Sequence, residues 1–369
     1  MSDIFPKFKA AVAQISPSFL NRDETVEKAC TTIEEAGGNG AKLIAFPESF
    51  IPGYPYWLWM ETPFDAAKYF KDFFKNSVEV PSPATKKLCR SAKKADCNVV
   101  MGMSSREGGT LYNAMLFIDS TGEIIGYRRK LIPTVAERTV WGRGDGSDLR
   151  VYNTDVGNIG GLICGENNMF LVKYALLAKG EQIHISNYPG TPLKTMRGFN
   201  EAIELIMRSF AILGQVFVLN AINVVNDETK QKIFDTDAKM QHYFDTNNGG
   251  ASIISPRGVY LAAPELHTEK ILYADIDMEM IIDSKWATDC VGHYARPDVT
   301  RLVINEERYT ICETAPPHID SSRVKQSGEF SKDLTLLNDE IQRTGNATLQ
   351  KIFSGFLQKY ISHQQEGIS

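Results

Sequence analysis

The sequence predicts an α/β protein in which helices pack against two β-sheets. Strand and helix signals alternate at the start of the chain, where an apolar run at 9–15 is followed by a helical pattern at 23–36 and a second apolar run at 42–46. This alternation is typical of helices packed on a sheet. Roughly ten short strands are predicted in all, which is many for one simple open sheet. Two packed sheets therefore fit the strand count better.

The first half of the chain continues with surface helices and a hairpin. Helical periodicity predicts helices at 63–75 and 85–94, whose polar faces carry many lysines and should face solvent. Strands are predicted at 99–104, 110–119 and 123–129. A Ser-Thr-Gly turn joins the last two of these strands, which predicts a hairpin.

The second half begins with a strand that turns into a helix. The apolar run 159–163 is interrupted by Gly160 and Gly161, which would let another backbone or a ligand come close. Helical spacing then appears at 169–176, so the chain must turn from strand to helix within about four residues. The remaining predicted elements are strands at 182–186, 216–221, 250–255, 259–262 and 271–276 and an apolar helix at 200–214.

Composition and charge limit the classes of function. The chain has 369 residues and is 43% hydrophobic, so it can bury a sizeable core. Its net charge is −5 and its lysines and arginines are scattered, so no basic stripe marks a nucleic-acid partner. Neither a signal segment nor a run of about 18 apolar residues is present, so we expect a cytoplasmic protein with no membrane span. The six cysteines contain no Cys-x-x-Cys pair, which argues against a disulfide framework and a structural zinc site.

Cys164 lies on the turn between strand and helix and is the candidate nucleophile. We expect the positive end of the helix dipole to lower the pKa of its thiol below the free value of about 8.5, which would raise the thiolate fraction. The alternative is that Cys164 is a small buried hydrophobic residue.

Glu48 is the candidate general base. It follows the strand at 42–46 and precedes 51–59, the most aromatic segment of the chain. A carboxylate in such surroundings is partly desolvated, so its pKa should rise toward neutrality. The alternative is a solvated loop residue.

Lys130 and Glu137 complete the candidate site. Lys130 follows the strand at 123–129, and loops that leave the same ends of strands converge on one rim of an α/β fold. Glu48, Lys130 and Cys164 could therefore meet, although a lysine at a strand end is often only a solvated charge. The glycine-rich loop 136–147 lacks the features of a phosphate-binding loop, and we interpret it as a lid or pocket wall that carries Glu137.

In this order, Glu48, Lys130 and Cys164 resemble the Glu-Lys-Cys triad of the carbon-nitrogen hydrolase superfamily. The resemblance is specific to the nitrilase branch and covers roughly residues 8–300. Four segments carry it: Phe46-Pro-Glu-Ser-Phe-Ile-Pro-Gly-Tyr-Pro-Tyr-Trp57, Arg128-Arg-Lys-Leu-Ile-Pro-Thr134, Ala136-Glu-Arg-Thr-Val-Trp-Gly-Arg-Gly-Asp-Gly-Ser147 and Val291-Gly-His-Tyr-Ala-Arg-Pro-Asp298.

The resemblance implies a four-layer α-β-β-α sandwich, with residues 1–300 as the catalytic domain and 301–369 as a partly flexible extension. It also implies a homo-oligomer whose dimers form through the helices after the cysteine and often build longer spirals. Glu137 is marked as a fourth catalytic residue. The residues expected to bind substrate are Tyr54, Trp57, Trp141, Gly165 and Asn187.

The implied reaction is hydrolysis of a small-molecule nitrile to a carboxylic acid and ammonia through a covalent intermediate on Cys164, with no metal or organic cofactor. One residue departs from the family pattern, because Gly165 stands where nitrilases commonly have tryptophan. The size of the substrates that other nitrilases accept therefore does not predict the size of the substrate of this chain. The alternatives are a cyanide hydratase or dihydratase, an aliphatic amidase and, more remotely, a non-catalytic assembly protein.

The last predicted element is an apolar helical stripe at 349–361. A monomer would have no obvious way to bury it, so we expect it to make subunit contacts. Docking on its own domain is the alternative.

Overall fold

The structure is a computed structural model that describes residues 5–245, 248–310, 329–343, 345–346, 349–350 and 352–356. The chain divides into two compact units, Met1–Tyr309 and Thr310–Ser369. The last residues of the first unit contact its earlier part: the N–H of Tyr309 donates to Asp145 (3.1 Å).

Within the described residues, the strands of the first unit form two six-stranded sheets. The first sheet has the order β12-β1-β2-β3-β4-β5, with β1 (Lys7–Gln14), β2 (Ala41–Ala45), β3 (Asn98–Glu107), β4 (Thr110–Ile118), β5 (Ile124–Arg129) and β12 (Lys270–Asp277). The second has the order β11-β10-β9-β8-β7-β6, with β6 (Tyr152–Thr154), β7 (Gly157–Ile163), β8 (Ile183–Tyr188), β9 (Phe217–Ile222), β10 (Ser252–Ile254) and β11 (Tyr260–Ala262). Parallel strands form the centre of each sheet, β1-β2-β3 in one and β7-β8-β9 in the other.

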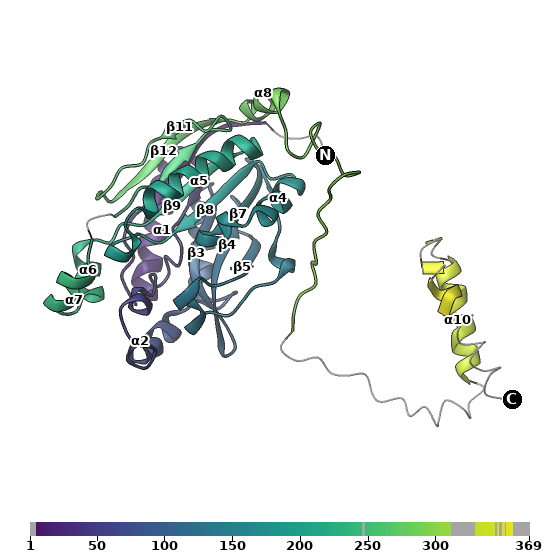
Figure 1. Ribbon diagram of the computed structural model, residues 1–369, viewed down its shortest axis with the longest axis horizontal. Helices are drawn as coiled ribbons and strands as arrows, with labels where there is room; N and C mark the ends of the chain where they lie inside the picture. The colour runs from purple at the N-terminus through teal and green to yellow at the C-terminus, as the bar shows by residue number, and fades with distance from the viewer. Residues whose placement is uncertain are drawn as a thin grey trace. The chain divides into compact units, whose positions relative to one another are not determined.

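Helices cover the outer face of each sheet (Figure 1). The first sheet packs against α1 (Arg22–Gly38) and α3 (Pro83–Ala95), whose buried side chains share one apolar cluster with its strands. The second sheet packs against α5 (Phe199–Gly214) and α4 (Phe170–Ala178), whose buried side chains also share apolar clusters with its strands. Further described helices are α2 (Pro63–Asn76), α6 (Asp227–Ile233), α7 (Asp237–Tyr243), α8 (Glu279–Ala287) and α10 (Glu329–Arg343), and residues 349–350 and 352–356 are helical too.

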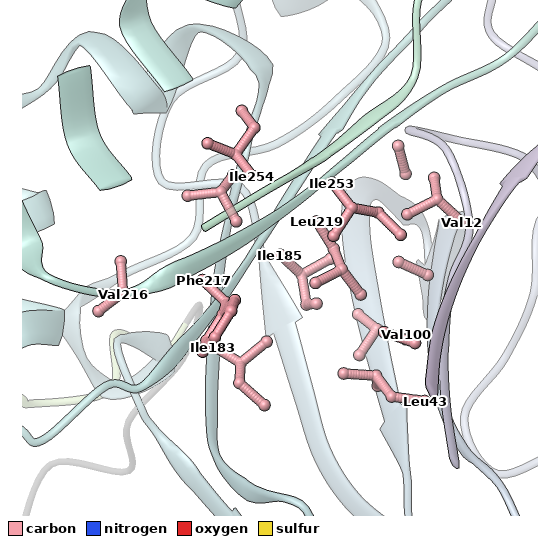
Figure 2. Close-up of a cluster of buried hydrophobic side chains, with 14 of the residues drawn as sticks. Val12, Leu43, Val100, Ile183, Ile185, Val216, Phe217, Leu219, Ile253 and Ile254 are labelled. Carbon is pink, nitrogen blue, oxygen red and sulfur yellow. The ribbon is translucent and has the colours of Figure 1, made fainter. Parts of the chain in front are cut away.

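The two sheets face each other across the main apolar core. Val12, Leu43 and Val100 of the first sheet lie across from Ile185 and Leu219 of the second (Figure 2). All five side chains are at most 1% exposed. The expected α-β-β-α sandwich is thereby confirmed.

The predicted strands and long helices are present, with ends shifted by a few residues. Five of the described strands and α-helices were not predicted: β6, α6, α7, α8 and α10. Both α6 and α7 are short, and each begins at a capping side chain, Asn226 or Thr236, without an apolar stripe that periodicity could detect. β6 has only three residues and is too short to show alternation.

The predicted stripe at 349–361 falls only in part on described residues. Phe353 is buried and stacks on Phe356, with ring centroids 6.3 Å apart. Leu357, Tyr360 and Ile361 lie outside the described residues, so the expected subunit contact stays a prediction. In the part of the chain that the structure describes, none of the helices has the length and apolar character needed to cross a membrane.

Candidate active site

Three loops bring the predicted residues to one rim of the two sheets. Glu48 follows β2, Lys130 follows β5 and Cys164 follows β7. β5 runs in the same direction as β2, because β2 and β3 are parallel and two antiparallel pairings separate β3 from β5. The N–H of Glu48 donates to the carbonyl of Tyr188 at the end of β8 (3.3 Å), which joins the rims of the two sheets. The strand ends therefore converge on one site.

Lys130 bridges two carboxylates. Its Nζ lies 2.8 Å from Glu48 Oε1 and 2.8 Å from Glu137 Oε2, and all three side chains are buried. Burial alone would lower the pKa of Lys130, but Glu137 and Glu48 outweigh it and hold that pKa well above its usual value. Lys130 is thus a fixed, desolvated positive charge rather than a solvated one.

One oxygen of Glu48 is occupied and the other is available. Oε1 accepts hydrogen bonds from Lys130 Nζ (2.8 Å) and Asn113 Nδ2 (2.6 Å). Oε2 is buried and has no hydrogen-bond partner among the described residues. Burial raises the pKa of Glu48 to about 7, against the lowering effect of the Lys130 charge. The predicted rise of this pKa is confirmed, so Glu48 can take up a proton near neutral pH.

The prediction for the thiol of Cys164 is wrong. Burial and the Glu48 carboxylate hold its pKa well above the usual value, and Lys130 and the N–H of Gly165 only partly offset them. The helix also begins later than expected, because the 3₁₀ turn Cys164–Asn168 precedes α4. No long helix dipole therefore starts at the thiol. The thiol is protonated at neutral pH and needs a base.

Glu166 ties the lysine loop to the cysteine loop. Its two oxygens accept a bidentate pair from Arg128 (2.7 Å each), and neither side chain has exposed surface. The same oxygens accept the backbone N–H groups of Leu131 (2.6 Å) and Ile163 (2.8 Å), the chain neighbours of the lysine and the cysteine. This buried ion pair fixes the spacing of the two loops.

Glu137 is held by hydrogen bonds on both oxygens. Oε2 accepts the Lys130 ammonium and the N–H of Thr134 (2.7 Å), and Oε1 accepts the hydroxyl of Tyr54 (2.8 Å). That hydroxyl accepts in turn from Trp59 Nε1 (3.1 Å). The expected pocket wall thus carries Glu137 into direct contact with Lys130.

A cavity of about 130 Å³ opens beside Cys164. Its lining is mostly apolar and aromatic, with three threonines and one carboxylate. The lining residues are Tyr54, Trp59, Thr134, Glu137, Cys164, Tyr188, Pro189, Thr191, Thr195, Met196 and Phe199. Such an enclosed apolar space favours a small uncharged ligand.

The residues expected to bind substrate occupy different places. Tyr54 lines the cavity formed by the described residues, whereas Trp57 and Trp141 do not. Trp57 stacks on Tyr69 (5.2 Å between centroids). Trp141 packs behind Tyr54, at 5.9 Å, and its indole donates to Ser104. Trp141 therefore supports the wall from behind, and neither tryptophan forms its surface.

Gly165 and Asn187 lie near the site without lining this cavity. A Cβ on Gly165 would be 3.1 Å from Thr134 Oγ1, and no other described atom outside its chain neighbours lies within 4 Å. Asn187 is fully buried at the end of β8.

Sequence reasoning missed Asn113 and several cavity residues. Asn113 interrupts the apolar run of β4, and a buried polar residue in a strand was the available signal. The segment 189–199 has no helical or strand periodicity, so nothing in its pattern marked its lining residues.

The chain matches the family model described as carbon-nitrogen hydrolase over residues 9–285. It is 36% identical over 352 residues to a nitrilase of a Bacillus species (strain OxB-1), covering 95% of this chain and 99% of that protein. It is 40% identical over 328 residues to an aliphatic nitrilase of Rhodococcus rhodochrous, covering 87% and 89%.

A solved structure supports the fold. The carbon-nitrogen hydrolase from Helicobacter pylori superposes with a TM-score of 0.62 at 21% identity, covering 81% of this chain and 100% of that chain. Together with the extent of the family match, these similarities show that the chain belongs to the carbon-nitrogen hydrolase family, within its nitrilase branch.

Proposed function

We propose that this protein is a nitrilase that converts a small uncharged nitrile into a carboxylic acid and ammonia. The observation that carries the proposal is the arrangement of Glu48, whose Oε1 is held by Lys130 and Asn113 while Oε2 is left without a described partner at the rim that carries Cys164. The names of the two relatives, a nitrilase and an aliphatic nitrilase, support it.

The first step forms a covalent bond to sulfur. Glu48 removes the proton of the Cys164 thiol, and the sulfur attacks the nitrile carbon. Negative charge develops on the nitrogen, where the desolvated Lys130 ammonium can stabilise it. The proton held by Glu48 then passes to the nitrogen, which gives a neutral thioimidate.

The second half of the reaction uses two waters. Glu48 takes a proton from the first water, whose oxygen adds to the thioimidate carbon. Glu48 passes that proton to the nitrogen, the added hydroxyl then gives up its own proton to the nitrogen, and ammonia leaves as the C=O of a thioester on Cys164 forms. A second water, deprotonated in the same way, releases the carboxylic acid and restores the thiol. Glu137 contributes by holding Lys130 at 2.8 Å.

The cavity supports the size and polarity of the substrate. An apolar cavity of about 150 Å³ can hold benzene, and the cavity beside Cys164 measures about 130 Å³. We expect nitriles with short aliphatic or compact ring substituents to react and nitriles with a charged substituent to react poorly, because the apolar lining would desolvate the charge.

Apolar residues on the outer helices support a homo-oligomer. Phe170 and Leu171 of α4 and Leu205 and Leu213 of α5 are all at least 58% exposed. We propose that α4 and α5 form the dimer contact. Leu205→Glu should lower the particle mass measured by light scattering if they do, and an unchanged mass would contradict this contact.

The alternatives are an aliphatic amidase and a cyanide hydratase, which would use the same four residues. The purified chain should be given panels of nitriles and amides and inorganic cyanide, with products identified by chromatography and ammonia measured. A nitrilase yields acid and ammonia from nitriles. Faster turnover of amides, or formamide production from cyanide, would favour an alternative. Cys164→Ala provides the control for uncatalysed hydrolysis.

A further inference from the structure

Behind the nucleophile turn, three polar side chains form a buried chain that the mechanism above does not use. Glu181, His184 and Asn167 are at most 5% exposed. Glu181 Oε1 lies 2.8 Å from His184 Nδ1, and His184 Nε2 lies 2.9 Å from Asn167 Oδ1. The Asn167 amide then donates to the carbonyl of Cys164 (3.1 Å). The chain therefore ends on the backbone of the nucleophile.

The hydrogen-bond partners fix the role of each group. Asn167 Nδ2 faces the carbonyls of Cys164 (3.1 Å) and Leu162 (3.4 Å), so Oδ1 is the acceptor that faces the imidazole. His184 Nε2 must then carry a hydrogen. Nδ1 faces the Glu181 carboxylate at 2.8 Å, so both ring nitrogens have a hydrogen-bond partner.

Gly160 leaves room for the side chains of Glu181 and His184. Gly160 pairs with His184 in the register of β7 and β8, and a Cβ on Gly160 would lie 2.1 Å from the Glu181 carboxylate. Phe210 of α5 covers the imidazole edge-on, with centroids 4.6 Å apart. A buried polar chain of this kind is weak evidence for stability, because apolar groups of the same shape can replace both partners of a hydrogen bond at little cost. Its contact with the nucleophile suggests a different role.

The contact with the Cys164 carbonyl sets the direction of the next N–H. In a trans peptide the C=O and N–H point to opposite sides, so a carbonyl fixed toward Asn167 directs the N–H of Gly165 away from Asn167. That N–H is among the groups that lower the pKa of the Cys164 thiol. Cys164 has a φ of 50°, a conformation that is strained for a non-glycine residue and persists only when its surroundings hold it.

We propose that Glu181, His184 and Asn167 form a positioning chain that holds the 164–165 peptide in one orientation and thereby fixes the position of the reacting sulfur. The proposal rests on the function assigned above to Cys164. A nucleophile held in one orientation does not have to reorganise when its proton leaves. None of the three residues lines the cavity, so each acts through the nucleophile turn.

The first test compares two buried asparagines. Asn98 is at most 1% exposed, like Asn167, and its amide also donates to a main-chain carbonyl, that of Lys42 (3.0 Å). It lies at the amino-terminal end of β3, whereas the site lies at the carboxyl ends of the parallel strands. Asn98→Ala is therefore a matched control for Asn167→Ala.

The main readout is the rate at which iodoacetamide alkylates Cys164, followed by peptide mass spectrometry. Misplacement of a reacting group by about 1 Å can cost a hundredfold, so Asn167→Ala should slow alkylation and lower kcat by about tenfold or more, with KM nearly unchanged. Asn98→Ala should keep both rates near wild type at a similar loss of melting temperature. Equal rates in the two variants would overturn the proposal.

Variants of His184 extend the test to cases where Asn167→Ala folds poorly. His184→Gln keeps a donor that can reach Asn167, whereas His184→Leu keeps none. The glutamine variant should retain more alkylation rate than the leucine variant, and the double variant His184→Leu with Asn167→Ala should be no slower than the slower single variant. Equal rates for Gln and Leu, or additive losses, would contradict a connected chain. Alkylation reports on the chain even if no nitrile is hydrolysed, so the two proposals fail separately.

Discussion

The Lys130 ammonium lies 2.8 Å from Oε1 of Glu48, and neither side chain has exposed surface. The two groups differ in how they titrate. The pKa of Lys130 lies well above its usual value, so the lysine keeps its proton, whereas the pKa of Glu48 rises to about 7. The lysine thus supplies positive charge, and the carboxylate can exchange a proton at neutral pH. The following predictions depend on this division of roles.

Activity should depend on the ionised form of Glu48. Its pKa is raised, so the carboxylate becomes protonated as pH falls through about 7, and the protonated form cannot accept the thiol proton. We expect kcat/KM to fall tenfold per pH unit below that point in a pH–rate profile. Glu48→Gln should lower kcat by about 10²–10⁴ and abolish this acid limb. An acid limb that survives in the variant would assign the titration to another group.

Asn113 should affect the pH at which Glu48 becomes protonated. Its hydrogen bond to Oε1 (2.6 Å) favours the ionised carboxylate and lowers the pKa of Glu48. Asn113→Ala should therefore raise that pKa and move the acid limb of kcat/KM to higher pH, with a smaller loss of kcat at the new optimum. Asn98→Ala, a buried asparagine remote from the site, should leave the limb in place. An acid limb that stays at the same pH or moves to lower pH in Asn113→Ala would contradict the assignment of this limb to Glu48.

The buried pair of Arg128 and Glu166 should matter for stability as well as spacing. Removing one partner leaves a buried charge unpaired, which costs about 3–5 kcal/mol. Arg128→Met should lower the free energy of unfolding by about this amount, measured by urea denaturation. Arg106→Met removes a partly exposed ion pair with Glu79 and should cost much less. Similar losses in the two variants would show that Arg128 is not specially buried in solution.

Glu137 should influence which group leaves the tetrahedral intermediate. Ammonia leaves when the nitrogen is protonated, whereas expulsion of the thiolate gives the amide. A carboxylate near that nitrogen favours its positive charge, and Glu137 both lines the cavity and contacts Lys130. Glu137→Gln should slow turnover and raise the amide fraction seen by chromatography. Slower turnover at an unchanged acid-to-amide ratio would reduce Glu137 to holding Lys130.

The sequence allowed the strand ends at Glu48, Lys130 and Cys164 to be predicted, because apolar runs mark the strands and parallel strands share a rim. It did not allow the pKa of the Cys164 thiol to be predicted, since the direction of the pKa shift depends on how closely Glu48 approaches and how deeply the site is buried. The aromatic segment at 51–59 predicted a desolvated carboxylate but not which rings face the ligand. Trp57 turns toward Tyr69, and Trp59 reaches the cavity instead.

The most direct test of the account is to identify the residue that carries the covalent intermediate. Wild type should be quenched in acid during turnover of a nitrile, digested, and analysed by peptide mass spectrometry. We predict that the acyl or thioimidate mass appears on the peptide that contains Cys164, and that Cys164→Ala shows no adduct and no turnover. An adduct on Cys30 or Cys290, or turnover by Cys164→Ala, would contradict the central claim.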